Sequence, residues 1–169
     1  MFRPGIDREA EARQAGIAGW SDLLTADDLY ADAIECLQRL AADGYRLAIA
    51  ANQPAPATEV IRAINALLPP PGLEFVGSSG DWGVVKPEPA FFARIAAELQ
   101  LPMSAIAYVG DRFDNDVMPA IDAGMTAVFI RRGPWGWIQG SEPGAADAAS
   151  LVIDTLAELA PALRRLDRT

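Results

Sequence analysis

The sequence predicts a doubly wound α/β fold, in which helices cover both faces of a mostly parallel sheet. Short apolar runs alternate with amphipathic segments of helical spacing along most of the chain, a pattern typical of repeated strand-helix units. Two of the runs, 106–109 and 126–130, are almost entirely apolar, as strands buried on both faces are. Polar and acidic residues follow these runs directly, where open parallel sheets place their ligand sites.

The first half of the chain is predicted to alternate between helix and strand. The elements are, in order, a helix over 28–43, a strand over 46–51, a helix over 58–68 and a strand over 73–76. The first helix carries apolar residues at helical spacing and ends before Gly44, a residue type that commonly terminates helices. The strand after it ends near Asn52, because Pro54 and Pro56 prevent its continuation.

The second half continues the same alternation. Its predicted elements are a helix over 90–99, a strand over 106–109, a helix over 117–123, strands over 126–130 and 150–153, and a helix over 156–166. Pro89 suits the first turn of the first of these helices, and Gly124 ends the second. Residues 131–137 are predicted to form a rigid aromatic loop at a strand end, which walls the crevice, binds a partner or packs on the domain's own surface.

Composition excludes several classes of function. The net charge of −9 has no long basic run to offset it, which disfavours nucleic-acid and anionic membrane partners. The absence of histidine excludes Ser-His-Asp and Cys-His nucleophiles and histidine zinc sites. The single cysteine, Cys36, excludes an intrachain disulfide and is interpreted as a small buried hydrophobe. Because we find no signal peptide and no membrane-length apolar run, we expect a soluble protein of the cytoplasm.

Acidic residues cluster directly after the strand predicted over 106–109. Asp111, Asp114 and Asp116 lie close together at its carboxyl end. Carboxylates at this spacing repel each other unless a cation lies among them, and such oxygen ligands suit Mg²⁺. The alternative interpretation is an acidic helix N-terminus, which Asp114 or Asn115 caps and the helix dipole favours.

The residues around this cluster resemble a known family. Residues 110–116, GDRFDND, followed by PAIDAGM, resemble motif IV of the haloacid dehalogenase superfamily of phosphatases and related hydrolases, with Asp111 and Asp116 in the two acidic positions. Lys86, in Lys-Pro-Glu-Pro, resembles motif III by its order and distance from the acidic turn. The resemblance covers about residues 28–166. It implies a three-layer Rossmann-like fold.

The resemblance also implies roles for these residues. Lys86 and Asp111 would be catalytic, and Lys86 would neutralise charge on the substrate phosphoryl group. Asp111 and Asp116 would hold Mg²⁺, but weakly, because a carboxylate and a backbone ligand of the family's metal site are missing. The segment after strand 46–51 resembles motif II, where the family has a Ser or Thr that binds phosphate; Ala51 stands there. Asn52 is therefore the candidate substrate-binding donor, and a turn residue is the alternative.

The first motif of the family has no counterpart that we can place in the sequence. Family members begin with an apolar strand that ends in D-x-D, whose first Asp attacks phosphorus and whose second acts as acid and base. Residues 1–25 show no such pattern, so we assign no nucleophile. We expect residues 1–25 to be a remnant of the family's helical cap or a linker, residues 26–169 to form the core, and the chain to begin late relative to the family.

The missing motif I strand has a structural consequence. In the family it lies between the strands that correspond here to 46–51 and 106–109. Its loss leaves a slot of roughly 10 Å, lined by unpaired backbone groups that cost about 1 to 3 kcal/mol each if buried. We expect one of three outcomes: the two strands pair directly, a segment of residues 1–25 fills the slot, or another polypeptide, either a second copy or a strand-donating partner, supplies a strand.

Two functions follow from these observations. The first is a Mg²⁺-dependent phosphatase of small phosphorylated molecules, with activity impaired because the nucleophile motif is missing. The alternative is a non-catalytic binding or scaffolding domain that keeps a crevice for anions and cations. In that case Trp82, Trp135 and Trp137 are candidate contact residues and the sheet slot is a candidate strand acceptor.

Overall fold

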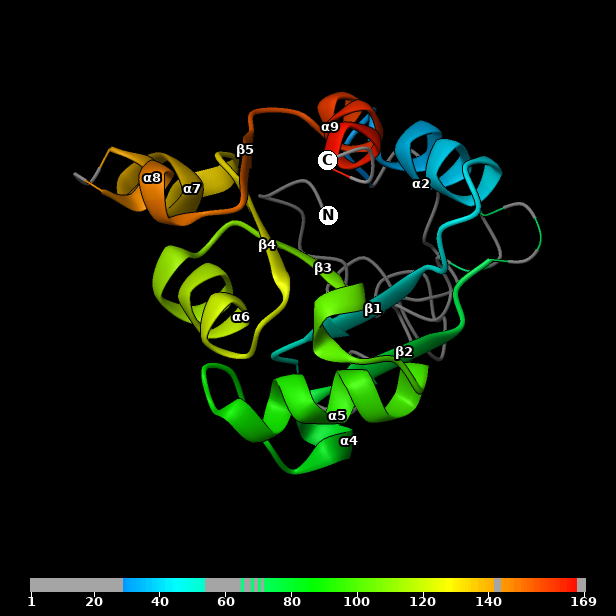
Figure 1. Cartoon of the computed structure of the whole chain (residues 1–169), viewed down its shortest axis with the longest axis vertical. Coiled ribbons are helices and arrows are strands. Elements are labelled where there is room, and N and C mark those ends of the chain that lie inside the picture. Colours follow the sequence, from blue (N-terminus) through cyan, green and yellow to red (C-terminus); the bar gives the residue numbers. More distant parts are fainter. Residues whose placement is uncertain are drawn as a thin grey trace, which may run out of the picture. The chain divides into compact units, whose positions relative to one another are not determined.

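A computed structural model describes residues 29–53, 65, 68, 70, 72–141 and 144–166. The chain divides into two compact units, Met1–Ser78 and Ser79–Thr169. Helices and strands alternate along most of the second unit, and the described part of the first unit contains one helix and two strands (Figure 1). Apart from residues 65 and 68, the helix predicted over 58–68 lies outside the described residues, and so does the domain boundary predicted between residues 25 and 26. No described helix has both the length and the apolar character that crossing a bilayer requires.

The first unit contains one described helix and a two-stranded parallel sheet. These are α2 (Ala33–Ala42), β1 (Ala48–Ala51) and β2 (Phe75–Ser78). Helix α2 buries Ala33, Cys36 and Leu40 on one face, as its apolar spacing predicts. The buried, unbridged Cys36 confirms its interpretation as a small hydrophobe. The chain leaves α2 through Gly44, whose φ of +88° glycine adopts without strain.

The second unit is built on a three-stranded parallel sheet. Its strands are β3 (Ala107–Gly110), β4 (Thr126–Ile130) and β5 (Leu151–Ile153), in that order across the sheet. Its described α-helices are α4 (Ser79–Trp82), α5 (Pro89–Leu99), α6 (Met118–Asp122), α7 (Gly133–Gly140), α8 (Ala145–Ala148) and α9 (Leu159–Leu166). The short turns Met103–Ala105 and Leu156–Glu158 are 3₁₀-helical, and Phe113–Val117 is π-helical.

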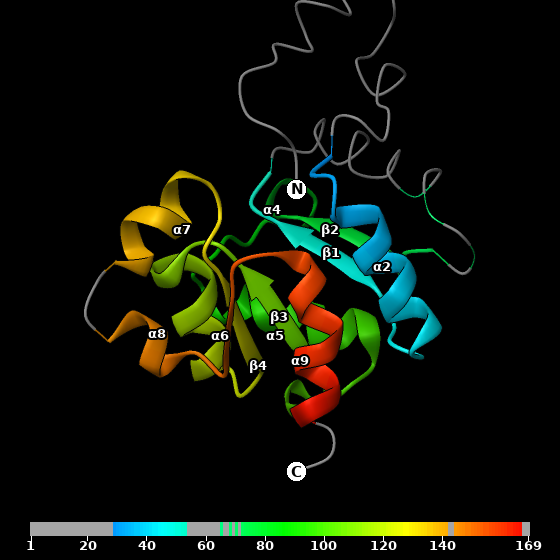
Figure 2. The ribbon, with the colours of Figure 1, turned by 90° about the horizontal axis from the view of Figure 1, so that it is seen from above.

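Helices lie on both sides of this sheet. Helix α6 lies on one side of β4 and α9 on the other (Figures 1 and 2), and α5 packs against α6. The register pairs Gly110 of β3 with Phe129 of β4, and Ile130 with Ile153 of β5. The carboxyl ends of the three strands therefore meet at one edge, and the predicted parallel α/β fold is confirmed.

Apolar side chains of β4 and α5 form the core of the second unit. Phe91, Phe92, Val128 and Phe129 are fully buried. The ring of Phe92 packs edge-on against Tyr108 with centroids 5.2 Å apart. Strand β4 is buried from Ala127 to Ile130. This burial agrees with its continuous apolar sequence, which is typical of a central strand in a parallel sheet.

The first of the three expected outcomes, direct pairing of the strands on either side of the motif I slot, is not found among the described strands. β1 is hydrogen-bonded to β2 in one sheet, and β3 is hydrogen-bonded to β4 in another. Filling of the slot by residues 1–25 falls outside the described residues. A strand from another polypeptide stays a prediction.

The predicted aromatic loop over 131–137 is wrong, because helix α7 begins at Gly133. Gly133 has a φ of +71°, which turns the chain out of β4. Pro134 then occupies the first turn, where its missing N–H is not needed. A glycine-proline pair usually signals a turn, so the local sequence favours a loop although the structure forms a helix.

The buried ring of Phe129 allows the core of the second unit to be tested. Phe129→Ala should lower the free energy of unfolding by about 3 to 5 kcal/mol, because it opens a cavity that close packing cannot refill. Trp137→Ala is the control, since Trp137 is 74% exposed and should change stability by less than about 0.5 kcal/mol. Urea unfolding followed by circular dichroism measures both, and equal losses would contradict this description of the core.

Candidate active site

A buried ion pair lies beside the carboxyl end of β3. Lys86 Nζ is 2.5 Å from Asp116 Oδ1, and the two side chains are only 11% and 5% exposed. Lys86 precedes α5 and is followed by a cis peptide bond to Pro87, whereas Asp116 lies in the π-helical turn after β3. The Lys86 ammonium also faces the rings of Phe91 and Tyr108, at 5.9 and 5.7 Å from their centroids. The fold therefore brings together a lysine and an aspartate that are 30 residues apart.

The second oxygen of Asp116 is held by the backbone. The Arg112 N–H donates to Asp116 Oδ2 at 3.1 Å. The Asp116 side chain also packs directly on Gly110, where an added Cβ would lie 2.3 Å from Asp116 Cβ. Only glycine fits at position 110 without moving the carboxylate. Asp116 is thus held in an orientation that directs Oδ1 towards Lys86.

Asp111 lies next to this pair, directly after β3. Burial raises the pKa of the Asp111 carboxyl, and the nearby charge of Asp116 raises it further, while Lys86 opposes the rise. The same two causes, burial first and then Asp116, raise the pKa of Tyr108 well above its usual range. A Cβ placed on Gly133 would be 3.4 Å from Asp111 Oδ2, so the carboxylate lies against the first residue of α7. The charged form of Asp111 is therefore destabilised and would gain from a cation.

Asp114, the third acid of the cluster, is held by partners other than Lys86. Its carboxylate accepts from the Arg112 guanidinium at 2.7 Å and from Gln139 Nε2 at 2.9 Å. The hydrogen bond from Arg112 is the main reason that the pKa of Asp114 is lowered. The π-helical turn begins after Arg112 without a side-chain cap. The alternative prediction, in which Asp114 or Asn115 caps a helix, is therefore wrong.

The structure brings together three of the four predicted site residues. Lys86, Asp111 and Asp116 lie in electrostatic contact within the second unit. Asn52 belongs to the first unit, where it is exposed directly after β1. Sequence reasoning missed Gln139, which contacts the acidic turn from α7, since no local pattern links residues so far apart along the chain.

The carboxylate oxygens of Asp111 are of the type that could bind Mg²⁺ at this site. Carboxylate oxygen is the ligand type that Mg²⁺ takes, and the ion usually keeps waters and binds only one or two carboxylates. Both oxygens of Asp116 are engaged, one by Lys86 and the other by the Arg112 N–H. Within the described ranges, no group of three or more acidic or cysteine side chains is arranged to hold a metal. Of the two predicted ligands, Asp111 is therefore the one whose carboxylate could hold the ion directly.

Comparison with known proteins gives the chain a family context. The family model described as haloacid dehalogenase-like hydrolase matches residues 7–124. The chain is 39% identical over 89 residues to the glyceraldehyde 3-phosphate phosphatase of Methanopyrus kandleri, and 30% identical over 98 residues to that of Methanocaldococcus jannaschii. These matches cover 52% and 58% of this chain but 37% and 41% of the relatives. The chain thus spans about two fifths of the length of the curated relatives it matches.

A solved structure shares the fold. The crystal structure of a HAD phosphatase from Thermococcus onnurineus is 26% identical and superposes with a TM-score of 0.68, over 92% of this chain and 69% of that one. The chain therefore has the Rossmann-like α/β fold of that protein.

The buried ion pair should be strongly coupled. Asp116→Asn or Lys86→Met alone should cost about 3 to 5 kcal/mol of unfolding free energy, because each leaves a buried charge unpaired. The double variant should cost clearly less than the sum of the two.

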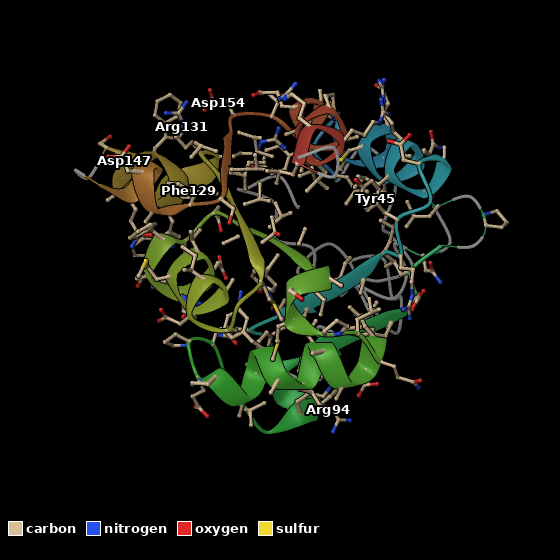
Figure 3. The ribbon with its side chains drawn as sticks, in the orientation of Figure 1. Tyr45, Arg94, Phe129, Arg131, Asp147 and Asp154 are labelled. Carbon is tan, nitrogen blue, oxygen red and sulfur yellow. The ribbon has the colours of Figure 1, made fainter. Side chains whose placement is uncertain are left out.

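The exposed pair between Arg131 and Asp154 is the control for this cycle (Figure 3). Its side chains are 42% and 58% exposed, so Asp154→Asn should cost at most about 1 kcal/mol. Additive effects at Lys86 and Asp116 in urea unfolding would contradict the pairing.

The raised pKa of Asp111 predicts that the Asp111→Asn variant is more stable than the wild type, by an amount that depends on pH. The folded state holds the Asp111 proton more tightly than the unfolded chain does, so the stability contributed by this group is present below its ordinary pKa of 3.8 and lost as pH rises through the raised value. Asp111→Asn should therefore be more stable than the wild type at pH 7, and the difference should vanish towards pH 3.8. Thermal unfolding across this range, without added metal, measures it.

Asp114→Asn is the matched comparison and should have the opposite sign. The lowered pKa of Asp114 means that its charge stabilises the folded state above its ordinary pKa. The Asn variant should lose a small amount of stability at pH 7 and none at low pH. The same sign at both positions would refute the electrostatic description of the turn.

Proposed function

The chain belongs to the haloacid dehalogenase-like hydrolase family, and from this we propose that it carries the phosphoryl-binding site of a Mg²⁺-assisted phosphatase of small molecules. One observation carries the proposal. A lysine that is only 11% exposed, paired with Asp116, lies beside the half-buried carboxylate of Asp111 at the end of a parallel strand. The two curated relatives named as glyceraldehyde 3-phosphate phosphatases support phosphate ester hydrolysis. They also make a triose phosphate the first substrate to test.

Lys86 is proposed to neutralise the phosphoryl group. Its ammonium is held by Asp116 Oδ1 and bordered by two aromatic rings. A cation fixed in this way needs little reorganisation when charge develops on phosphate oxygens, and fixed charges in a partly dry site are effective in catalysis. Asp116 therefore acts through Lys86, whose position it sets.

Asp111 is proposed as the carboxylate that holds Mg²⁺ at this site. Its charge is opposed by burial and by Asp116, so a bound cation relieves an existing cost. When bound, the ion would offset charge on the phosphoryl oxygens. The second ligand predicted from the family, Asp116, keeps both oxygens on Lys86 and Arg112, and we propose that it contributes charge at longer range.

Two further assignments belong to the proposal. Asn52 is proposed as a donor to the substrate from the end of β1, and the cytoplasm as the site of action. Covalent phosphoryl transfer requires a nucleophile, and the motif I Asp that has this role in the family is not assigned within this sequence. We therefore propose that a polypeptide of this sequence binds phosphate and Mg²⁺ but turns over slowly, which leaves a non-catalytic binding domain as the second candidate function.

Binding and turnover measured together test the function. The 169-residue chain should bind inorganic phosphate in a Mg²⁺-dependent manner by calorimetry. Lys86→Gln should weaken phosphate binding by roughly 10²-fold, since it removes the fixed charge. Asp111→Asn should remove the dependence on Mg²⁺. Asp154→Asn, at an exposed carboxylate paired with Arg131, is the control and should change neither.

Hydrolysis of p-nitrophenyl phosphate and of glyceraldehyde 3-phosphate separates the two candidate functions. Slow turnover with intact binding supports the proposal as stated. Fast turnover that Asp111→Asn abolishes would show that the chain contains a nucleophile and would favour the full phosphatase. Absence of both phosphate and Mg²⁺ binding in a folded chain would refute the site.

A further inference from the structure

Helix α7 contacts the acidic turn, defined as residues 111–116, from both its first residue and its last turn. At the start of α7, Gly133 lies against the Asp111 carboxylate. Further along the helix, Gln139 and Trp135 contact Arg112, Phe113 and Asp114. Because α7 follows β4 and the acidic turn follows β3, these contacts join the ends of two neighbouring strands.

Gln139 uses both polar atoms of its amide on this turn. The backbone N–H of Phe113 donates to Gln139 Oε1 at 2.7 Å. Gln139 Nε2 donates to Asp114 Oδ1 at 2.9 Å. A single side chain thus fixes one backbone group and one carboxylate of the same short segment. Glutamate cannot donate the second bond at neutral pH, and alanine provides neither.

A stacked arginine adds to this contact. The Arg112 guanidinium lies 4.6 Å from the ring centroid of Trp135, and it also pairs with Asp114. Trp135 and Gln139 are four residues apart and therefore lie on one face of α7. The turn is thus held from α7 at three successive residues.

Helix α7 is itself fixed to the end of β4. Gly136 is buried, and a Cβ there would lie 2.9 Å from the carbonyl oxygen of Ile130. At Gly140 an added Cβ would lie 3.2 Å from Arg131 Cδ. Gly136 thus allows α7 to approach the backbone at the end of β4 closely, and Gly140 allows it to pack on the Arg131 side chain.

We propose that Gln139 is a positioning residue, which sets the backbone of the acidic turn so that Asp116 is held against Lys86 and Asp111 faces the site. The path is a continuous series of contacts. Gln139 fixes the Phe113 N–H, the adjacent Arg112 N–H donates to Asp116 Oδ2, and Asp116 Oδ1 accepts from Lys86. Any effect of Gln139 on catalysis rests on the proposed function, whereas the contacts of Gln139 with the acidic turn are independent of it.

The first test measures the turn without any ligand. Amide hydrogen exchange by NMR should show the Phe113 N–H exchanging about tenfold faster in Gln139→Ala, as expected for one lost hydrogen bond. The amide of Val128 in β4 should be unchanged. Ile138→Ala is the matched control, because Ile138 lies on the same helix and is 60% exposed. The proposal would be overturned if Gln139→Ala left the exchange rate of the Phe113 amide unchanged. It would also be overturned if the variant raised the exchange rates of all amides in the second unit by a similar factor.

The second test asks whether the position of the turn affects the site. Gln139→Ala should weaken Mg²⁺ binding by roughly 10- to 100-fold in calorimetry, the range found when groups that orient a ligand are removed. Combining Gln139→Glu with Asp114→Asn keeps the total charge and reverses one hydrogen bond, because the new amide at position 114 can donate to the new carboxylate at position 139. This exchanged pair should restore binding to near the wild-type value. Gln139→Glu alone should not, because two carboxylates then repel each other.

The two tests separate the two proposals. A wild-type chain that binds no Mg²⁺ would refute the proposed function, and the exchange rates at Phe113 would still decide the role of Gln139. If Gln139→Ala loses Mg²⁺ affinity and the exchanged pair does not restore it, the positioning role of Gln139 is overturned. Loss of side-chain packing alone would then account for the weaker Mg²⁺ binding.

Discussion

The buried pair between Lys86 and Asp116 is the constraint on which the arrangement of the site depends. It joins the segment before α5 to the turn after β3, and both side chains are almost completely removed from solvent. A charge buried without its partner costs several kcal/mol, so the fold strongly favours the arrangement that brings these two segments together. Gly110 follows from the same constraint, because any side chain there would displace Asp116.

The ion pair between Lys86 and Asp116 contributes more to the position of its two side chains than to the free energy of unfolding. Buried ion pairs contribute little net free energy compared with apolar residues of similar size, since desolvation offsets most of the attraction. Beside it, Asp111 bears a charge that burial and Asp116 both oppose. The fold therefore keeps a carboxylate with a raised pKa next to a fixed ammonium, which supports the proposed site for a cation and an anion.

The sequence predicted the elements and residues whose signals are local. Strand β4 matches its predicted range because its apolar run is continuous. Asp111 and Asp116 were predicted as site residues from the acidic turn and its resemblance to motif IV, whereas Lys86 was predicted only from its order and distance relative to that turn, as in motif III. Helix α7 was missed because its glycine-proline start indicates a turn, and the contacts of Gly136 and Gly140 with Ile130 and Arg131 appear only in the folded chain. Gln139 was missed for the same physical reason: its partners lie about 25 residues earlier, and nothing in its own neighbourhood specifies them.

The π-helical turn lies directly before the helix that the sequence predicts from about residue 117, which the structure forms as α6. In this turn the Val117 N–H reaches back five residues to the Arg112 carbonyl. The wider turn accommodates one more residue than an α-helical turn, and such turns are frequent at functional sites. Here it buries Val117 in the core while Asp116 pairs with Lys86 and Asp114 with Gln139. The spacing of the acids in this turn therefore reflects a backbone shaped by its side-chain partners, and local helix propensity alone would not produce it.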